Sequence, residues 1–536
     1  MNPILVGDTI RFTVICPELV RIEYSRIGRF VDEPTLFAAL RSSDESRFTT
    51  VHESDVLRIA TDRFELEYRG EGAKPDNENL VIRLGRQPSS WSRGAWSEGN
   101  ATGEPQGEWR PGMQNTENLG GPLQTLDNCT GALPLGDGLL SRNGWYLLDD
   151  SRAHVFEDGW IAERPHLHSE IDWYFFGYGS DYRAALHALA LVGGKVPLPR
   201  KHVLGSWYCR WWPYTSDDYR QIVSEYEEHD FPIDVLVMDM DWHRRDGTTG
   251  FGWCNRGAMG WTGWSWNRDL LPDVEDLIAE LRADDVYVTL NAHPHDGVRT
   301  NEDMYDDFMR ELGHDPSEKR DLPFLSGDRR YVEAYFRHAH EPHERMGVDF
   351  WWVDWQQDSI MPFVYHIPYL KHLPWLNYLY FKNSEKLGRR GLGFSRWAGW
   401  GDHRHPIHFS GDTAANWEVL EFEIPFTVAS GNAGCFFWSH DTGGFSSKER
   451  DPELYTRWVQ FCALSAALRL HSAGAHLDRR PWLWGEPYTS AMREAFHLRA
   501  QLMPYIYTAA RQSHDQTVPL LRAMYLDHPH EQEAYE

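Results

Sequence analysis

The stretch Val348-Asp349-Phe350-Trp351-Trp352-Val353-Asp354 is an apolar run of strand length that ends on a carboxylate. A second run, Ile407-His408-Phe409-Ser410-Gly411-Asp412, ends in the same way. A (β/α)8 barrel presents side chains in this manner, because all of its strands point their C-terminal ends at one common face. A single Asp after a strand is more simply a turn former or the N-cap of a helix. The alternation of strand-like and helical segments around these two runs decides between the interpretations.

From His202 onward the sequence alternates between apolar strand-like runs and amphipathic helical stretches, which predicts a parallel sheet. Helices are expected at 217–229, 273–282 and 375–386. Eight strands are expected, at 203–209, 235–240, 286–291, 350–354, 393–396, 407–410, 435–439 and 468–471. We therefore predict a (β/α)8 barrel, a TIM barrel, over residues 196–515, with long inserts at 244–272 and 297–327 after strands two and three.

The first 195 residues have a different pattern. Short segments with alternating apolar and polar residues, separated by Gly, Asp and Asn, predict an N-terminal antiparallel β-sandwich over residues 1–195. A helix near 181–191 and a Gly- and Pro-containing linker at 193–199 lead into the barrel. At the other end, the run Leu520 to Asp527 looks like a strand without a partner, so residues 516–536 are expected to begin a truncated C-terminal β region.

Composition excludes several classes of partner. The formal net charge is -27, from 80 acidic and 53 basic residues of which eight are Lys. This balance disfavours nucleic acids and anionic membranes. It fits a salt-rich cytoplasm, although a Lys-poor sequence can equally reflect genome base composition. Whether the chain forms a homo-oligomer stays open.

The cysteines and the N-terminus bear on the compartment. The six Cys have no CxxC or metal-ligand spacing, so reduced thiols are expected. The N-terminus has neither a basic nor an apolar leader region, and no run approaches the roughly 20 apolar residues of a membrane span. These features predict a soluble, cytoplasmic protein.

The two strand-terminal acids suggest a chemistry. Cleavage of a glycosidic bond requires one carboxylate at the anomeric carbon and one carboxylic acid at the leaving oxygen, roughly 5 to 5.5 Å apart in retaining enzymes. Asp354 and Asp412, at the ends of strands four and six, could provide this pair. The neighbouring Trp351, Trp352 and Trp355 would lower the local dielectric, or simply fill the core. An aromatic content of 14%, with 25 Trp, also fits a carbohydrate as the small-molecule partner.

Motifs along nearly the whole chain resemble glycoside hydrolase family 31. The barrel carries the opening strands at 203–212 and 232–242, Trp352-Val353-Asp354, Arg396 with Ser410-Gly411-Asp412, Asp441-Thr442-Gly443-Gly444-Phe445 and Arg469-Leu470-His471. Upstream, 118–121, Thr125-Leu126-Asp127 and 139–145 resemble that family's N-terminal β-sandwich.

The resemblance implies a retaining α-glycosidase with Asp354 as nucleophile and Asp412 as general acid/base. It also implies that Asp239, Arg396 and His471 bind sugar hydroxyls, and that Trp352, Phe409 and Phe445 form apolar walls. Each contact has an alternative. Asp239 could cap a helix, Arg396 could be a structural ion-pair partner, and His471 could be a core histidine.

Two departures from the family's pattern touch the pocket. Gln356 and Gln357 follow the nucleophile, where the family more often has a Met-Asn-Glu type of sequence, and Phe409 stands where Trp is common. We therefore predict an exo-acting α-glycosidase that prefers α-glucosides, with α-galactosides, α-xylosides or N-acetyl-α-galactosaminides as alternatives. A transglycosidase and a noncatalytic sugar-binding protein are the rivals. No cofactor is required and no metal ligand is assigned; His293 and His295 are interpreted as substrate or solvent contacts.

Overall fold

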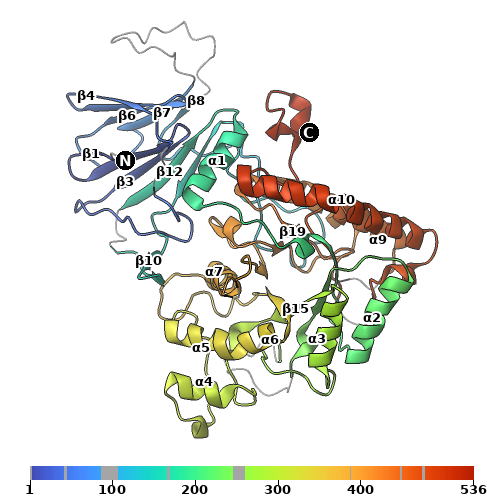
Figure 1. Ribbon diagram of the computed structural model, residues 1–536. Coiled ribbons are helices and arrows are strands. Elements are labelled where there is room, and N and C mark those ends of the chain that lie inside the picture. The colour runs from blue at the N-terminus through green and yellow to red at the C-terminus, as the bar shows by residue number, and fades with distance from the viewer. Residues whose placement is uncertain are drawn as a thin grey trace.

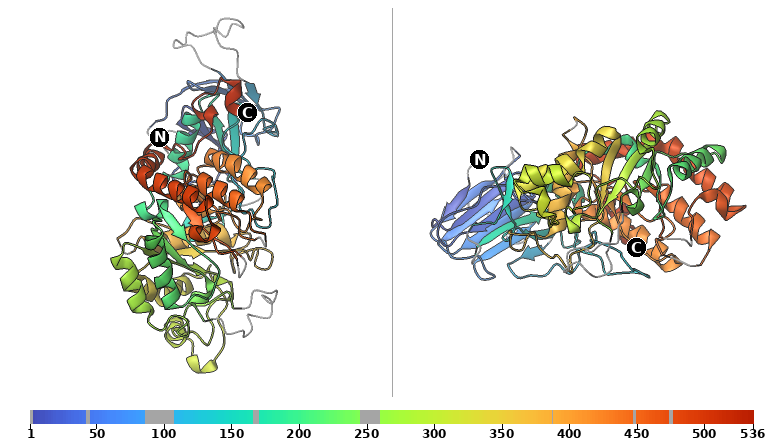
Figure 2. Two further views of the ribbon diagram at one scale, coloured as in Figure 1. Left: turned by 90° about the vertical axis from the view of Figure 1, so that its right-hand side faces the viewer. Right: turned by 90° about the horizontal axis from the view of Figure 1, so that it is seen from below.

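The computed structural model describes residues 3–41, 45–85, 107–165, 170–244, 260–386, 388–446, 449–473 and 477–536. An all-β domain forms one end of the molecule and a barrel with its helices forms the rest (Figure 1). In the right-hand view of Figure 2 the blue strands of the first domain lie beside the barrel. Residues 245–259, within the first predicted insert, lie outside the described part of the chain.

The N-terminal domain is a sandwich of two antiparallel five-stranded sheets, as predicted. Their orders are β1-β2-β3-β12-β9 and β4-β5-β6-β7-β8. Alternate residues such as Phe12, Ile59 and Leu66 turn inward and are fully buried between the sheets. The strands are β1 Ile4–Val6, β2 Ile10–Cys16, β3 Leu19–Tyr24, β4 Thr49–Glu53, β5 Val56–Ala60, β6 Phe64–Arg69, β7 Leu80–Leu84, β8 Gly107–Trp109, β9 Trp145–Asp149 and β12 Ile171–Gly177; β10 Val155–Glu157 and β11 Trp160–Ala162 form a separate hairpin.

All eight predicted barrel strands are present and parallel, in the order β19-β18-β17-β16-β15-β14-β13-β20. A parallel bridge between Ser439 and Ala467 joins the two ends of this order and closes the barrel. Residues 203 and 204, the start of the first expected strand, instead belong to a short 3-10 helix, Lys201–Leu204. The strands are β13 Ser206–Tyr208, β14 Val235–Met238, β15 Tyr287–Ala292, β16 Val348–Val353, β17 Phe394–Ser395, β18 His408–Phe409, β19 Trp438–Ser439 and β20 Leu468–Leu470.

Helices surround the strands. The α2 helix begins with a capping box in which Thr215 and Asp218 satisfy each other's backbone N–H groups. None of the helices in the described ranges combines the length and apolarity needed to cross a lipid bilayer. Their bounds are α1 Tyr182–Gly193, α2 Ser216–Glu228, α3 Val274–Ala283, α4 Tyr305–Leu312, α5 Arg329–Ala339, α6 Glu341–Met346, α7 His372–Ser384, α8 Trp417–Ser430, α9 Pro452–Cys462 and α10 Tyr488–Gln516.

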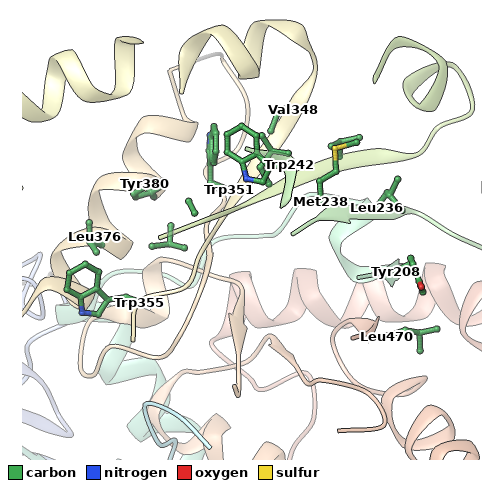
Figure 3. Packing of buried hydrophobic residues seen from close by; sticks show 14 of the residues in the cluster. Tyr208, Leu236, Met238, Trp242, Val348, Trp351, Trp355, Leu376, Tyr380 and Leu470 are labelled. Carbon is green, nitrogen blue, oxygen red and sulfur yellow. The ribbon is translucent and has the colours of Figure 1, made fainter. Parts of the chain in front are cut away.

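The side chains of β16 show how the strand divides the core. Phe350 and Trp352 point into the barrel interior, while Trp351 and Val353 pack outward against the helices. Figure 3 shows Trp351 beside Trp242 in this outer layer, with ring centroids 6.1 Å apart. Trp351 and Trp355 are therefore core residues, and only Trp352 of the three lies on the inner side of the barrel wall.

A hydrophobic cluster joins the sandwich to the C-terminal end of the chain, and Trp400 of the barrel packs against it. It is built from α1, the segment around Leu139 and Leu140, and residues at the C-terminal end of the chain. The guanidinium of Arg404 donates hydrogen bonds from the barrel to the carbonyl oxygens of Leu36, Phe37 and Gly193. The two domains are thus packed as one body.

The prediction of a strand at 520–527 is wrong. A 3-10 helix, Met524–Leu526, forms there and buries Tyr525, whose ring packs against Tyr182 of α1 at 5.8 Å. A strand requires an edge to pair with. The sequence run was apolar because Tyr525 and Leu526 bury against the sandwich side of the molecule.

Arg499 in α10 ties this helix to the barrel. Its buried guanidinium donates to the carbonyl oxygens of Gly205, Ala463 and Ser465 at 3.2, 2.9 and 2.8 Å, and to those of Leu204, Cys462 and Ala466.

We expect Arg499→Leu to lower the free energy of unfolding by about 3–5 kcal/mol, because several buried carbonyls lose their donor. Urea unfolding followed by circular dichroism measures this. Arg511→Leu on the same helix removes only an exposed pair with Asp515 and should cost less than about 0.5 kcal/mol; equal losses would contradict the assignment.

Candidate active site

The barrel collects the predicted site residues at the C-terminal ends of its strands. Asp239 directly follows β14, Asp354 follows β16, Arg396 follows β17 and His471 follows β20. Asp412 stands three residues after β18. Because these strands are parallel neighbours in one closed sheet, their next residues meet at one face.

Arg396 connects the two candidate catalytic acids. Its Nη2 lies 3.0 Å from Asp354 Oδ1 and 3.9 Å from Asp412 Oδ1. Its Nη1 lies 2.7 Å from Asp127 Oδ1 and also donates to Thr125. One nitrogen thus lies close to both acids, which places the two carboxylate oxygens at most about 7 Å apart. The guanidinium is 1% exposed and lies over the Phe409 ring at 4.6 Å.

Asp354 is held in the ionised form. Burial opposes its charge, but Arg396 and His293 outweigh burial and hold the pKa of Asp354 well below its usual range. His293, directly after β15, places Nε2 3.3 Å from Asp354 Oδ2. The backbone N–H of Asp354 donates to the Ala292 carbonyl at 3.1 Å, which fixes the carboxylate relative to β15.

Asp412 is shifted in the opposite direction. Burial and the negative charge of Asp354 raise its pKa well above the usual value, against the attraction of Arg396, and Asp127 raises it further. Its side chain is 27% exposed, compared with 9% for Asp354. Gln356 Nε2 donates to Asp412 Oδ2 at 3.3 Å and to Asp127 Oδ2 at 3.1 Å, so one of the two departures in sequence contacts the acid.

Asp127, a residue of the N-terminal domain, belongs to the site although the sequence assigned it no role. Its Oδ1 accepts the backbone N–H of Asp412 at 2.8 Å in addition to Arg396. Main-chain hydrogen bonds place its segment along the loop after β18: Leu126 N–H to Ser410 O at 2.7 Å and Asn128 N–H to Asp412 O at 2.9 Å. The motif Thr125-Leu126-Asp127 was the available signal, but only the tertiary contact gives it a function.

Gly411 permits this close approach. It adopts φ +106°, and a Cβ placed there would overlap with Asp127 Oδ1 and Arg396 Nη1. Residues that carry a Cβ rarely adopt this backbone conformation. Gly411 is therefore required both by its backbone conformation and by the close approach of Asp127 and Arg396.

Asp239 and His471 form another part of the wall. His471 Nε2 lies 4.0 Å from Asp239 Oδ2. Burial, with the nearby charge of Asp354, raises the pKa of Asp239 to about 7, and burial also holds the pKa of His471 well below its usual value. Asp239 Oδ1 additionally accepts the Met240 N–H at 2.7 Å and so caps a short 3-10 helix, as the structural alternative predicted.

Aromatic rings surround these groups. Trp352 meets Phe409 edge to face at 5.4 Å, and His471 lies 5.4 Å from Trp352 and 5.2 Å from Phe445. Arg469 belongs to a motif that resembles the family, but the sequence suggested no role for it. Its guanidinium lies over Trp352 at 5.1 Å and pairs with Asp441. Burial raises the pKa of Asp441 to about 6.

Several buried polar atoms at this face have no hydrogen-bond partner among the described residues. They include both side-chain polar atoms of Asn291, His293 Nδ1, Trp352 Nε1, Arg469 Nη1 and His471 Nδ1. Buried polar groups normally are paired. Donors and acceptors gathered around aromatic walls are suited to a ligand that carries many hydroxyl groups.

Comparison with known proteins fits this geometry. The model of the glycosyl hydrolases family 31 TIM-barrel domain matches residues 196–509. The chain belongs to glycoside hydrolase family 31. Its relatives include Alpha-glucosidase 2 of Bacillus thermoamyloliquefaciens, 23% identical over 68% of this chain and 48% of that protein. An Alpha-xylosidase of Saccharolobus solfataricus is 25% identical over 68% of this chain and 50% of that protein. The family 31 chain thus spans about half the length of the curated relatives it matches.

Solved structures share the fold of this family 31 chain. A GH31 dextranase of Flavobacterium johnsoniae complexed with glucose superposes with a TM-score of 0.72 at 18% identity, covering 98% of this chain and 70% of that one. A GH31 alpha-xylosidase from a soil metagenome complexed with xylose gives 0.72 at 18% identity, over 99% and 88% of the two chains. These likenesses confirm the predicted fold class.

Asp127 should tune the acid. Removing its charge in Asp127→Asn takes away one of the influences that raise the pKa of Asp412, so the alkaline limb of kcat/KM against pH should move to lower pH, while an oxygen remains to accept the Asp412 N–H. A pH–rate profile with an aryl α-glycoside measures the shift. Asp137→Asn, an exposed acid on the same segment, is the matched control. An alkaline limb that stays in place in Asp127→Asn would refute the role.

Proposed function

We propose that this family 31 chain is a retaining exo-α-glycosidase that hydrolyses terminal non-reducing α-linked sugars, with α-glucosides as the first choice. The observation that carries the proposal is the single buried guanidinium of Arg396, which lies within 3.0 Å of Asp354 and 3.9 Å of Asp412. The upper limit of about 7 Å on the separation of these oxygens is compatible with the roughly 5 to 5.5 Å of retaining enzymes and lies below most of the range of inverting ones.

The reaction proceeds by double displacement. Asp354 attacks the anomeric carbon as the bond to the leaving oxygen breaks, and Asp412 gives its proton to that oxygen. Asp412, now ionised, takes a proton from water as the water oxygen attacks the same carbon and displaces Asp354. Two inversions release the sugar in its original α-configuration.

The opposite pKa shifts support this division of roles. A nucleophile must be ionised, and Arg396 with His293 favours the ionised form of Asp354. A general acid must be protonated, and burial with the charge of Asp354 favours the protonated form of Asp412. Two carboxyl groups with pKa values driven apart by their surroundings are the usual pattern for acid and base assignments.

The remaining wall supports recognition of one terminal sugar. Asp239 and His471 would bind hydroxyl groups, and Trp352, Phe409 and Phe445 would enclose the apolar faces of the ring. The names Alpha-glucosidase 2 and Alpha-xylosidase among the relatives favour gluco- and xylo-configured substrates. α-Galactosides and N-acetyl-α-galactosaminides stay as alternatives, since Gln356 and Phe409 change the pocket.

Two rivals are separable by experiment. A transglycosidase shares the first half-reaction and passes the sugar to another hydroxyl group instead of water; the solved neighbours include a cycloalternan-forming enzyme of Listeria monocytogenes. A noncatalytic sugar-binding protein would bind but never turn over. The opposite pKa shifts of two facing acids favour catalysis over binding alone.

Azide should distinguish the two acids. In Asp412→Ala, azide needs no general base and should intercept the covalent intermediate, which restores turnover and yields an α-glycosyl azide. In Asp354→Ala it should displace the leaving group directly and yield the β-azide. We expect either variant to lose at least about 10²–10⁴ of kcat/KM without azide. Proton NMR of the azide products checks the assignment; an α-azide from Asp354→Ala, or undiminished activity, would refute it.

The pH dependence follows from the two shifts. Activity requires ionised Asp354 and is lost as the pH falls through its lowered pKa; it requires protonated Asp412 and is lost as the pH rises through its raised pKa. The profile of kcat/KM should therefore be bell-shaped, with an alkaline limb far above the ordinary carboxyl pKa of about 3.9.

A panel of gluco, galacto, xylo and N-acetylgalactosamino aryl α-glycosides should be used for these measurements, with the highest kcat/KM expected for the glucoside. A highest value for another sugar would overturn the glucoside preference alone.

A further inference from the structure

Three side chains of different chemistry meet on the wall of the barrel mouth. Cys209 follows β13, Asp239 follows β14 and His471 follows β20, three strands that are neighbours in the sheet. One sulfur, one carboxylate oxygen and one imidazole nitrogen lie within 4.8 Å of one another. All three residues are buried, at 0%, 5% and 1% exposure.

The barrel register fixes this convergence. Tyr208 of β13 pairs with Leu470 of β20 and with Leu236 of β14. The Cys209 N–H then donates to the Leu470 carbonyl at 2.9 Å, which holds the backbone of Cys209 beside that of His471. The cluster therefore rests on the rigid strand ends and not on a flexible loop.

We propose that Cys209, Asp239 and His471 bind a thiophilic divalent cation of the Zn²⁺ class, and that this cation excludes the sugar from the catalytic pocket. Thiolate, imidazole and carboxylate are the three ligand types that Zn²⁺ takes in proteins, at about 2.3, 2.0–2.1 and 2.0–2.2 Å. Mg²⁺ and Ca²⁺ prefer sites made of oxygen atoms alone. The presence of sulfur and nitrogen therefore selects zinc, cadmium or cobalt over the alkaline-earth ions.

The geometry requires a small adjustment. Tetrahedral ligand atoms at these bond lengths are about 3.3–3.7 Å apart, so the present separations must close by roughly 1 Å, which side-chain rotation can provide. His471 Nε2 already lies 4.0 Å from Asp239 Oδ2, and His471 Nδ1 has no hydrogen-bond partner in the described part of the chain. On binding, the Cys209 thiol and any protonated Asp239 carboxyl give their protons to solvent, and a water molecule completes the four ligands.

The cation would act as an inhibitor. Asp239 and His471 are the side chains assigned above to sugar hydroxyl groups, so a bound cation removes them from the sugar. This competition rests on the proposed function, whereas cation binding itself does not. A spectroscopic readout therefore keeps a failure of the site distinct from a failure of the glycosidase assignment.

The direct test is titration of the full chain with Co²⁺, whose thiolate complexes absorb in the near ultraviolet. The absorption should saturate at one equivalent and be displaced by Zn²⁺, which binds such sites more tightly. It should vanish in Cys209→Ser and Cys209→Ala, with near-ultraviolet circular dichroism confirming their fold. Cys435→Ser is the matched control, because Cys435 Sγ lies 3.5 Å from His408 Nδ1 and offers another thiol–imidazole pair; it should keep the absorption.

The kinetic test uses Zn²⁺ with an aryl α-glycoside. Zn²⁺ should raise KM and leave kcat unchanged, and Cys209→Ser should weaken the inhibition at least about tenfold. A wild type without thiolate absorption would overturn the site, with no variant needed. So would absorption that survives in both Cys209 variants or disappears in Cys435→Ser. Inhibition that lowers kcat at constant KM would overturn the competition with sugar.

Discussion

The buried guanidinium of Arg396 is the constraint on which the site depends. It contacts Asp354 and Asp127 and lies 3.9 Å from Asp412, so three carboxylates gather around one cation. The guanidinium favours the ionised form of Asp354, whereas burial and the charge of Asp354 favour the protonated form of Asp412. Arg396 follows the two-residue strand β17 and lies over the Phe409 ring. A short strand in a closed barrel thereby positions the positive charge between the proposed nucleophile and the proposed acid.

The second constraint is that the sandwich domain completes the site. Asp127 reaches the barrel because its neighbours Leu126 and Asn128 bond the backbone of the loop that carries Asp412. The hydrogen bonds of Arg404 to the sandwich side, and the packing of Trp400 against the cluster around α1, hold the domains in this relation. Gly411 leaves the space that Asp127 and Arg396 occupy. A change in the packing of the two domains would therefore alter the environment of the proposed acid directly.

Burial acts differently on the two sides of the pocket. Near Arg396 and His293, opposite charge outweighs burial and keeps Asp354 ionised. Around Asp239 and His471, burial dominates and favours the neutral forms of both groups. A pocket whose charged groups are paired, as Arg396 is with Asp354 and Arg469 is with Asp441, suits a neutral sugar, since the sugar hydroxyl groups form hydrogen bonds without bringing charge of their own. The proposed cation would use the same neutral imidazole of His471 together with the deprotonated forms of Asp239 and Cys209.

The alternation of apolar runs and helices by itself determined the barrel, because runs such as 348–353 have the length of a strand and are followed by a polar residue. Spacing and motif also predicted that Asp354 and Asp412 share one face. The strand expected at 520–527 failed because apolar patterning cannot tell a paired strand from a short helix that buries Tyr525. The contacts of Asp127, His293 and Cys209 join segments that are distant in the sequence. Only the strand register and the packing of the two domains bring these segments together, and no local sequence pattern encodes the distance between two such side chains.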